Sequence, residues 1–424
     1  MMMGVTDTVL LGGLGDNPLA VGGLGTSLLL TLMLVLQGLV MPVSVLVAQA
    51  RGAGRDTALP VLYWTGMLLS VLLMVPAFAL FSVAEPLLLA VGEPPALAHD
   101  VGRFMSVLRW CTPGEMIAFG VMRSFLPALG GGPTILWVTL VAAIANGWLC
   151  YGLIHGAWGL PALGTDGAAM ASVIIFSAMG VALLALVHGR ARMRRFVAWA
   201  RPDGAVLRVM LRLGLPIAAT LAVEAGLFLA VALMIGLLGP AALAAQQVAL
   251  NALSIAFMIP LGIAQAVNVR VGHHIGAGDG PGARRAGLVA IGLGATFEVG
   301  SALILLLAPR TVAGLYLDPA NVEAFDIAVG LLGVATAFQV ADGVQVVAVG
   351  ALRGLGDTRV PFALAALGYW GIGFPAAWWL TMRAGAGPAG AWWGLALGLS
   401  VVAVLLMARF LRRSRLTIMP VRLP

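Results

Sequence analysis

The sequence predicts an all-α membrane protein that crosses the bilayer many times. Of its 424 residues, 61% are hydrophobic and 10% are charged, and the mean hydropathy is +1.03. A soluble domain carries about 25% charged residues. Apolar runs long enough to cross a bilayer as helices follow one another from end to end. Composition and run length together therefore indicate a polytopic helical membrane protein.

Hydropathy divides the chain into about twelve crossings. The second and eighth exceed the length that a helix perpendicular to the membrane needs, so we expect them to tilt or protrude. The expected ranges are 1–14, 21–50, 60–82, 101–128, 134–156, 165–189, 213–237, 243–274, 285–308, 325–353, 360–382 and 388–411.

The basic residues predict the orientation. All 24 are arginine, and they are densest in residues 190–214. Most follow even-numbered crossings, and the opposite side holds little beyond Arg310 and Arg383. Arginine-rich short loops stay in the cytoplasm and lie near anionic lipid. We therefore expect a multi-pass protein of the cytoplasmic (inner) membrane with both termini in the cytoplasm and membrane lipid as a partner. The arginines are not interleaved with aromatic residues on a soluble module, so no nucleic-acid partner is predicted.

An internal repeat predicts two six-helix lobes. LGDNPLA at 14–20 matches LGPAALA at 238–244, and AQARGAG at 48–54 falls on GHHIGAG at 272–278 at the same offset of 224 residues. An even number of crossings per repeat gives both lobes the same orientation, related by a pseudo-two-fold axis along the membrane normal.

The repeat also sets the expected domain ranges. We expect an N-terminal lobe at 1–189, a cytoplasmic linker at 190–212, a C-terminal lobe at 213–411 and a cytoplasmic tail at 412–424. In the repeat, residue 1 corresponds to Ala225, which lies in the middle of the seventh crossing. We therefore expect the first helix to be truncated at its N-terminus, with the true start upstream.

Two acids stand inside crossings of the second lobe. Glu224 and Asp342 each lie near the middle of an apolar stretch. A charge there costs roughly 2.5–3.5 kcal/mol on insertion scales, so an acid at this depth is a functional candidate. Gln339 and Gln345 flank Asp342 at a spacing of three, which places all three side chains on one helix face.

Other polar residues of the crossings have two interpretations. Gln247 and Asn251 are one turn apart in the eighth crossing, and Asn146 is in the fifth. Such side chains either line a cavity or join neighbouring helices by hydrogen bonds. Cys111 and Cys150 both lie in apolar stretches and predict no disulfide framework. No motif with the spacing of a metal site, and no nucleophile–base arrangement, is present, so neither an enzyme nor a bound cofactor is predicted.

Several strings resemble the multidrug and toxic compound extrusion (MATE) family. VTDTVLLGGLG, LVAQARGAGR, RSFLPALGGGPTILWVTLVAAIANGWLCYGLI and above all VQVVAVGALRGLGDTRVPF carry the resemblance, which covers nearly the whole chain. The resemblance implies a two-lobed antiporter of twelve helices. It would export organic cations and drugs in exchange for Na⁺ or H⁺.

Within that family, the chain is similar to the NorM-like branch. Glu224 and Asp342 occupy the positions of that branch's acids in the seventh and tenth helices, and Asp7 matches its acid in the first. Another branch has an Asn-x-x-x-Asp step in the fifth helix, where this chain has Asn146 and Cys150. The resemblance therefore implies a coupling and substrate site at Glu224 and Asp342, with Asp7 as a third member.

The coupling ion stays open between Na⁺ and H⁺. Desolvation favours the neutral form of a carboxyl group, which suits a proton carrier. Two carboxylates with amide oxygens would equally suit a desolvated Na⁺ at Glu224 and Asp342. We expect a monomer that exports cationic drugs or metabolites. A lipid-linked oligosaccharide flippase is the alternative, but it would need cavity arginines to grip pyrophosphate.

Overall fold

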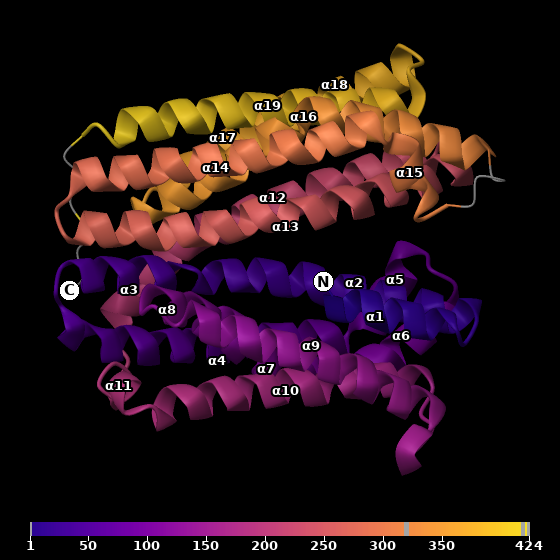
Figure 1. Ribbon diagram of the computed structural model, residues 1–424. Coiled ribbons are helices and arrows are strands. Elements are labelled where there is room, and N and C mark those ends of the chain that lie inside the picture. The colour runs from indigo at the N-terminus through magenta and orange to yellow at the C-terminus, as the bar shows by residue number, and fades with distance from the viewer. Residues whose placement is uncertain (1, 318–321, 417–419, 422–424) are drawn as a thin grey trace. The chain divides into compact units, whose positions relative to one another are not determined.

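A computed structural model describes residues 2–317, 322–416 and 420–421. Within these residues the secondary structure is entirely helical, as the sequence predicts. The described residues divide into two compact units (Figure 1). The N-terminal unit contains residues 2–47 and 55–214, and the C-terminal unit contains residues 48–54 and 215–421 apart from the gaps. Parts of the predicted tail, at 417–419 and 422–424, lie outside the described residues.

The N-terminal unit begins with a short helix and contains one strongly segmented crossing. Its α-helices and short 3₁₀ and π turns are α1 (Met2–Gly12), α2 (Asp16–Val40), α3 (Pro42–Gly52), η1 (Asp56–Ala58), α4 (Leu59–Ser82), α5 (Ala84–Val91), α6 (Pro95–Leu108), η2 (Arg109–Cys111), α7 (Thr112–Glu115), η3 (Met116–Met122), α8 (Arg123–Ala128), α9 (Gly132–His155), η4 (Ala157–Gly159), α10 (Thr165–Gly189) and α11 (Ala191–Arg194). The last residues of α3 belong to the C-terminal unit.

The C-terminal unit consists mainly of long helices. They and the shorter segments between them are α12 (Gly204–Gly236), which starts in the N-terminal unit, α13 (Pro240–Gly276), α14 (Gly280–Leu307), α15 (Pro309–Gly314), α16 (Val322–Gly354), α17 (Arg359–Ala366), η5 (Leu367–Gly373), α18 (Phe374–Trp378), η6 (Trp379–Arg383) and α19 (Gly387–Arg413).

Ten helices of the described chain are long and apolar enough to cross a membrane, and they match ten of the expected crossings. The other two expected crossings take different forms. Residues 1–14 contain only the 11-residue α1. Residues 101–128, expected as one helix, are divided among α6, η2, α7, the π turn η3 and α8. Pro113 explains a break there, because proline lacks a backbone N–H and its ring crowds the preceding turn.

Helix α16 is the centre of the C-terminal unit. It packs against α13, α14 and α19, and these helices run alongside one another in Figure 1. Glycines permit the close approach: a Cβ on Gly350 of α16 would lie 2.4 Å from the carbonyl oxygen of Ala264 on α13. Small residues at such contacts are typical of helix pairs in membranes. The backbone of α16 is therefore held at the middle of the unit.

The α13–α14 turn is fixed by a cap. Gly278 adopts φ +74°, a left-handed conformation that glycine tolerates. Asp279 then accepts a hydrogen bond of 2.8 Å from the backbone N–H of Gly282, and His274 Nδ1 lies 2.9 Å from its carboxyl group. The backbone hydrogen bond from Gly282 is the main reason that the pKa of Asp279 lies below its usual value. The turn thus positions α14 against α13.

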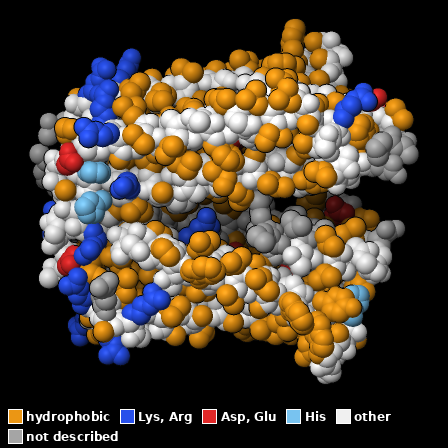
Figure 2. Space-filling model, viewed as in Figure 1, with side chains coloured by type: hydrophobic (Ala, Val, Ile, Leu, Met, Phe, Trp, Pro, Cys, Tyr) orange, Lys and Arg blue, Asp and Glu red, His pale blue; other side chains and the backbone are white. Residues whose placement is uncertain are grey.

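The surface agrees with a membrane environment. Large apolar side chains such as Leu237 and Leu307, both 81% exposed, point outward, and hydrophobic side chains cover much of the face in Figure 2. In the C-terminal unit, arginines occur where α14 begins and α19 ends, among them Arg285 and Arg412. The exposed apolar faces suit contact with lipid, and the charged helix ends suit the membrane–water interface.

Gly350→Ala should destabilise the protein. The new Cβ would collide with a helix backbone that cannot move independently, and such overpacking costs about 1–3 kcal/mol. The matched control is Gly262→Ala on α13, where a Cβ would meet nothing within 4 Å. Thermal unfolding of detergent-solubilised protein should show a lower midpoint for the first variant only. Equal midpoints for both variants would contradict the proposed packing.

Candidate functional site

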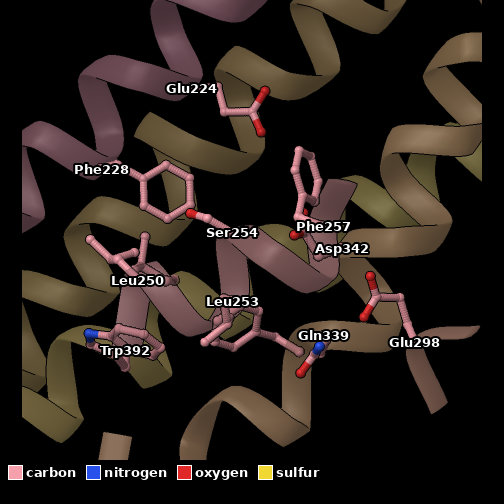
Figure 3. Close-up of a pocket in the computed structure, with 12 residues that line it drawn as sticks. Glu224, Phe228, Leu250, Leu253, Ser254, Phe257, Glu298, Gln339, Asp342 and Trp392 are labelled. Carbon is pink, nitrogen blue, oxygen red and sulfur yellow. The ribbon is translucent and has the colours of Figure 1, made fainter. Parts of the chain in front are cut away.

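The C-terminal unit contains a cavity of about 280 Å³ that is lined by acids and apolar side chains. Five helices contribute to it: α12, α13, α14, α16 and α19. Figure 3 shows the acids Glu224, Asp342 and Glu298 around it. The lining is Glu224, Phe228, Leu250, Leu253, Ser254, Phe257, Glu298, Phe338, Gln339, Asp342, Trp392 and Leu395.

The two acids that the sequence singles out come from different helices to this one cavity. Glu224 lies in the middle of α12, and Asp342 lies in the middle of α16. Both are half-buried. Their neighbours in the chain are apolar. Each helix is also long enough to cross a membrane, so each acid lies near the middle of a candidate membrane span. The structure thus brings together the residues that the resemblance pairs.

Gln339 is the predicted amide that lines the cavity beside Asp342. It lies three residues earlier on α16, on the same helix face. Its Nε2 donates a hydrogen bond of 2.6 Å to Ser301 Oγ on α14, and its side chain also hydrogen-bonds Glu298. Its Oε1 is buried and accepts no hydrogen bond in the described structure. One free acceptor therefore remains next to the acids.

The walls of the cavity are largely apolar and aromatic. Phe228 and Phe257 stand near the acids in Figure 3. Phe338 and Trp392 pack together with ring centroids 5.9 Å apart. Aromatic faces attract cations, and apolar walls accept the body of an organic molecule. The arrangement suits a molecule that is both apolar and positively charged.

Three other predicted amides lie outside this lining. Gln345 is buried and hydrogen-bonds Tyr369, so it contributes to packing within the unit. Gln247 and Asn251 are on α13, and both are exposed. Neither side chain belongs to the cavity lining, although Leu250 and Ser254, which follow Gln247 by three and seven residues on α13, do.

Asp7 and Asn146 are hydrogen-bonded to each other within the N-terminal unit. Asn146 Nδ2 donates to Asp7 Oδ1 at 2.8 Å, and Ser172 Oγ donates to Asp7 Oδ2 at 3.2 Å. Asp7 is on α1, and its two donors are on α9 and α10. Asp7 and Asn146 are both buried. The N-terminal unit thus contains a buried carboxyl group of its own, which is hydrogen-bonded by residues of two further helices.

Sequence reasoning missed two members of the cavity, Glu298 and Trp392. Glu298 stands within the apolar stretch 285–308, so the rule that identified Glu224 and Asp342 applied to it as well. The sequence shows no counterpart for it in the repeat. Trp392 stands near the start of the expected crossing 388–411, where a tryptophan typically anchors a helix at the interface, but it is 1% exposed and lines the cavity.

The fold and the cavity define a class: an all-helical membrane protein with carboxyl groups in an apolar-walled cavity. The chain belongs to the MatE family, whose pattern matches residues 1–151 and 216–379. It is 53% identical over 417 residues to a probable multidrug resistance protein NorM of Burkholderia mallei, covering 98% of this chain and 89% of that protein. The multidrug resistance protein NorM of Burkholderia vietnamiensis is 52% identical over 424 residues, covering 99% and 92%.

Solved structures share the fold. An outward-facing multidrug resistance MATE family transporter of the MOP superfamily superposes with a TM-score of 0.88 at 19% identity, over 98% of this chain and 94% of that one. The eukaryotic MATE transporter AtDTX14 gives a TM-score of 0.86 at 23% identity, over 97% and 93%. At these identities the similarity establishes the architecture of the chain.

Asn146→Ala should destabilise the protein more than Ser172→Ala. Asn146 makes the shorter bond to a buried carboxyl group, and leaving such a group unsatisfied costs about 1–3 kcal/mol. The measurement is the thermal unfolding midpoint of each purified variant. Identical midpoints for Asn146→Ala and the unchanged protein would show that Asp7 does not depend on this bond.

Proposed function

We propose that the chain is a secondary active multidrug efflux transporter. It exports organic cations in antiport with Na⁺ or H⁺ by alternating access. The relatives named multidrug resistance proteins, which the chain matches along almost its whole length, support the substrate class. The proposal assigns transport and no enzymatic role, because transport needs neither a nucleophile nor a cofactor.

The observation that carries the proposal is the pairing of Glu224 and Asp342 in one apolar-walled cavity. A cation that enters replaces the water lost by the carboxylates, and the aromatic walls hold its apolar part. The coupling ion and the organic cation compete for the same negative charge. Binding of one therefore promotes release of the other, and this exchange is the physical basis of antiport.

The remaining features of the proposal follow from the sequence. Alternating access suits two units that each contain a set of membrane helices, and Asp7 supplies a further acid in the N-terminal unit. We place the protein in the cytoplasmic membrane as a monomer, with the arginine-rich connections and both termini in the cytoplasm. A lipid-linked oligosaccharide flippase is the weaker alternative, because the cavity lining holds three acids and no arginine.

Asp342→Asn and Glu224→Gln should each reduce ethidium efflux by at least about tenfold, because each removes a charge that the cation needs in a dry site. Efflux is measured by fluorescence in a host that lacks its own pumps, with membrane levels compared by immunoblot. Gln247→Ala is the matched control, since Gln247 is an exposed amide outside the cavity lining. Unchanged efflux in Asp342→Asn at equal membrane levels would refute the assignment.

Purified protein in proteoliposomes should take up a fluorescent organic cation only when an ion gradient of opposite direction is imposed. A Na⁺ gradient and a pH gradient are applied separately, and the one that drives uptake identifies the coupling ion. Protein-free liposomes and the Asp342→Asn variant are the controls. Uptake that requires neither gradient would exclude antiport.

A further inference from the structure

Glu298 has the least solvent-exposed side chain of the three acids of the cavity. It lies on α14 and is 1% exposed, whereas Glu224 and Asp342 are half-buried. Its Oε2 is shielded from solvent and has no hydrogen-bond partner in the described structure. Figure 3 shows Glu298 on a different side of the cavity from Glu224, with Asp342 between them in this view. A third carboxyl group therefore lines the cavity, and one of its oxygens has no hydrogen-bond donor.

No positive charge compensates Glu298 within the described residues. The ion pairs His274–Asp279, Arg310–Asp326 and Arg409–Asp357 do not include Glu298. Arg353 of α16 interacts electrostatically with Glu224. The titratable groups that face it across the cavity are Glu224 and Asp342, while α13 and α19 contribute no titratable group to the lining. An isolated buried carboxylate beside other acids is so costly that it takes up a proton instead.

The packing around Glu298 is specific to its side chain. A Cβ on Gly343 of α16 would lie 2.4 Å from Glu298 Cγ, so the glutamate side chain occupies the space that this glycine leaves free. Gly294, one turn earlier on α14, gives α16 a second close approach, since its Cβ would meet Val347 at 2.9 Å. The two glycines hold Glu298 against α16, next to Asp342.

The three acids come to the cavity from three different helices, α12, α14 and α16. The described residues contain no group of three His, Cys, Asp or Glu side chains that could hold a metal ion. Glu298 forms a subsite of its own, filled closely by its side chain and Gly343, and a proton fits this space better than a cation that needs several oxygen ligands.

We propose that Glu298 is a separate proton-binding group that releases its proton when an organic cation binds at Glu224 and Asp342. Neighbouring carboxyl groups in a dry site do not all ionise, and the solvent-shielded oxygen of Glu298, which lacks a hydrogen-bond donor, makes it the group to which we assign the shared proton. A cation beside Asp342 offsets the negative charge there and makes ionisation of Glu298 favourable. This inference rests on the proposed function, because it concerns the same cavity.

The first test is chemical labelling with dicyclohexylcarbodiimide, which reacts with protonated carboxyl groups in apolar surroundings. Peptide mass spectrometry of the full-length protein in detergent should find Glu298 modified at about pH 6 and progressively less as the pH rises toward about 9. Tetraphenylphosphonium should reduce the modification at constant pH. An unmodified Glu298 at about pH 6, or modification suppressed by NaCl but not by choline chloride, would overturn the inference.

The second test counts protons. Calorimetric titration with tetraphenylphosphonium in buffers of different ionisation enthalpy gives the number of protons released per bound cation. In Glu298→Gln this number should fall by about one, and the Kd should lose its dependence on pH over the range in which Glu298 titrates. Glu298→Asp should restore part of the release, which separates a titrating role from a purely structural one. Monodisperse elution of each variant is required first.

The outcomes distinguish the two proposals. A wild-type protein that binds no organic cation would overturn the proposed function. A wild-type protein that binds the cation but releases the same number of protons as Glu298→Gln would overturn the role of Glu298 alone.

Discussion

The cost of burying charge in an apolar environment governs this structure. Each apolar side chain makes the free energy of inserting a helix into a bilayer more favourable, and each acid makes it less favourable. The C-terminal unit nevertheless places Glu224, Asp342 and Glu298 around one cavity. Such a cluster persists only if its acids are neutral, satisfied by hydrogen bonds or matched by a cation. The electrostatic state of the cavity therefore depends on what occupies it, and that dependence can couple two ligands.

The packing of α16 makes this electrostatic arrangement possible. The helix carries Gln339, Asp342, Gly343 and Gly350 within a few turns. Its glycines let α13 and α14 approach α16 closely. Side chains of all three helices line the cavity. Close packing and polar function thus share one helix. A change in the contact between α14 and α16 would alter the distance between Glu298 and Asp342, and with it the balance of charge.

Much of the fold and part of the site could be predicted from the sequence. Hydropathy identified the long helices, because bilayer thickness fixes their length. It failed at 101–128, where π and 3₁₀ turns interrupt a continuous apolar run. The depth of an acid in its crossing identified Glu224 and Asp342. The sequence could not show that Gln247 and Asn251 are exposed and outside the lining, because Leu250 and Ser254, at helical spacing from Gln247, belong to it.

Glu298 shows why the repeat is an incomplete guide to the site. Duplicated halves share helices and turns, since both must meet the same bilayer, but an acid can enter one half alone. A site that needs net negative charge gains from a third carboxyl group only if that group can be neutral when the cavity is empty. The close fit of Glu298 to Gly343 gives it a position from which water is excluded and Asp342 is near.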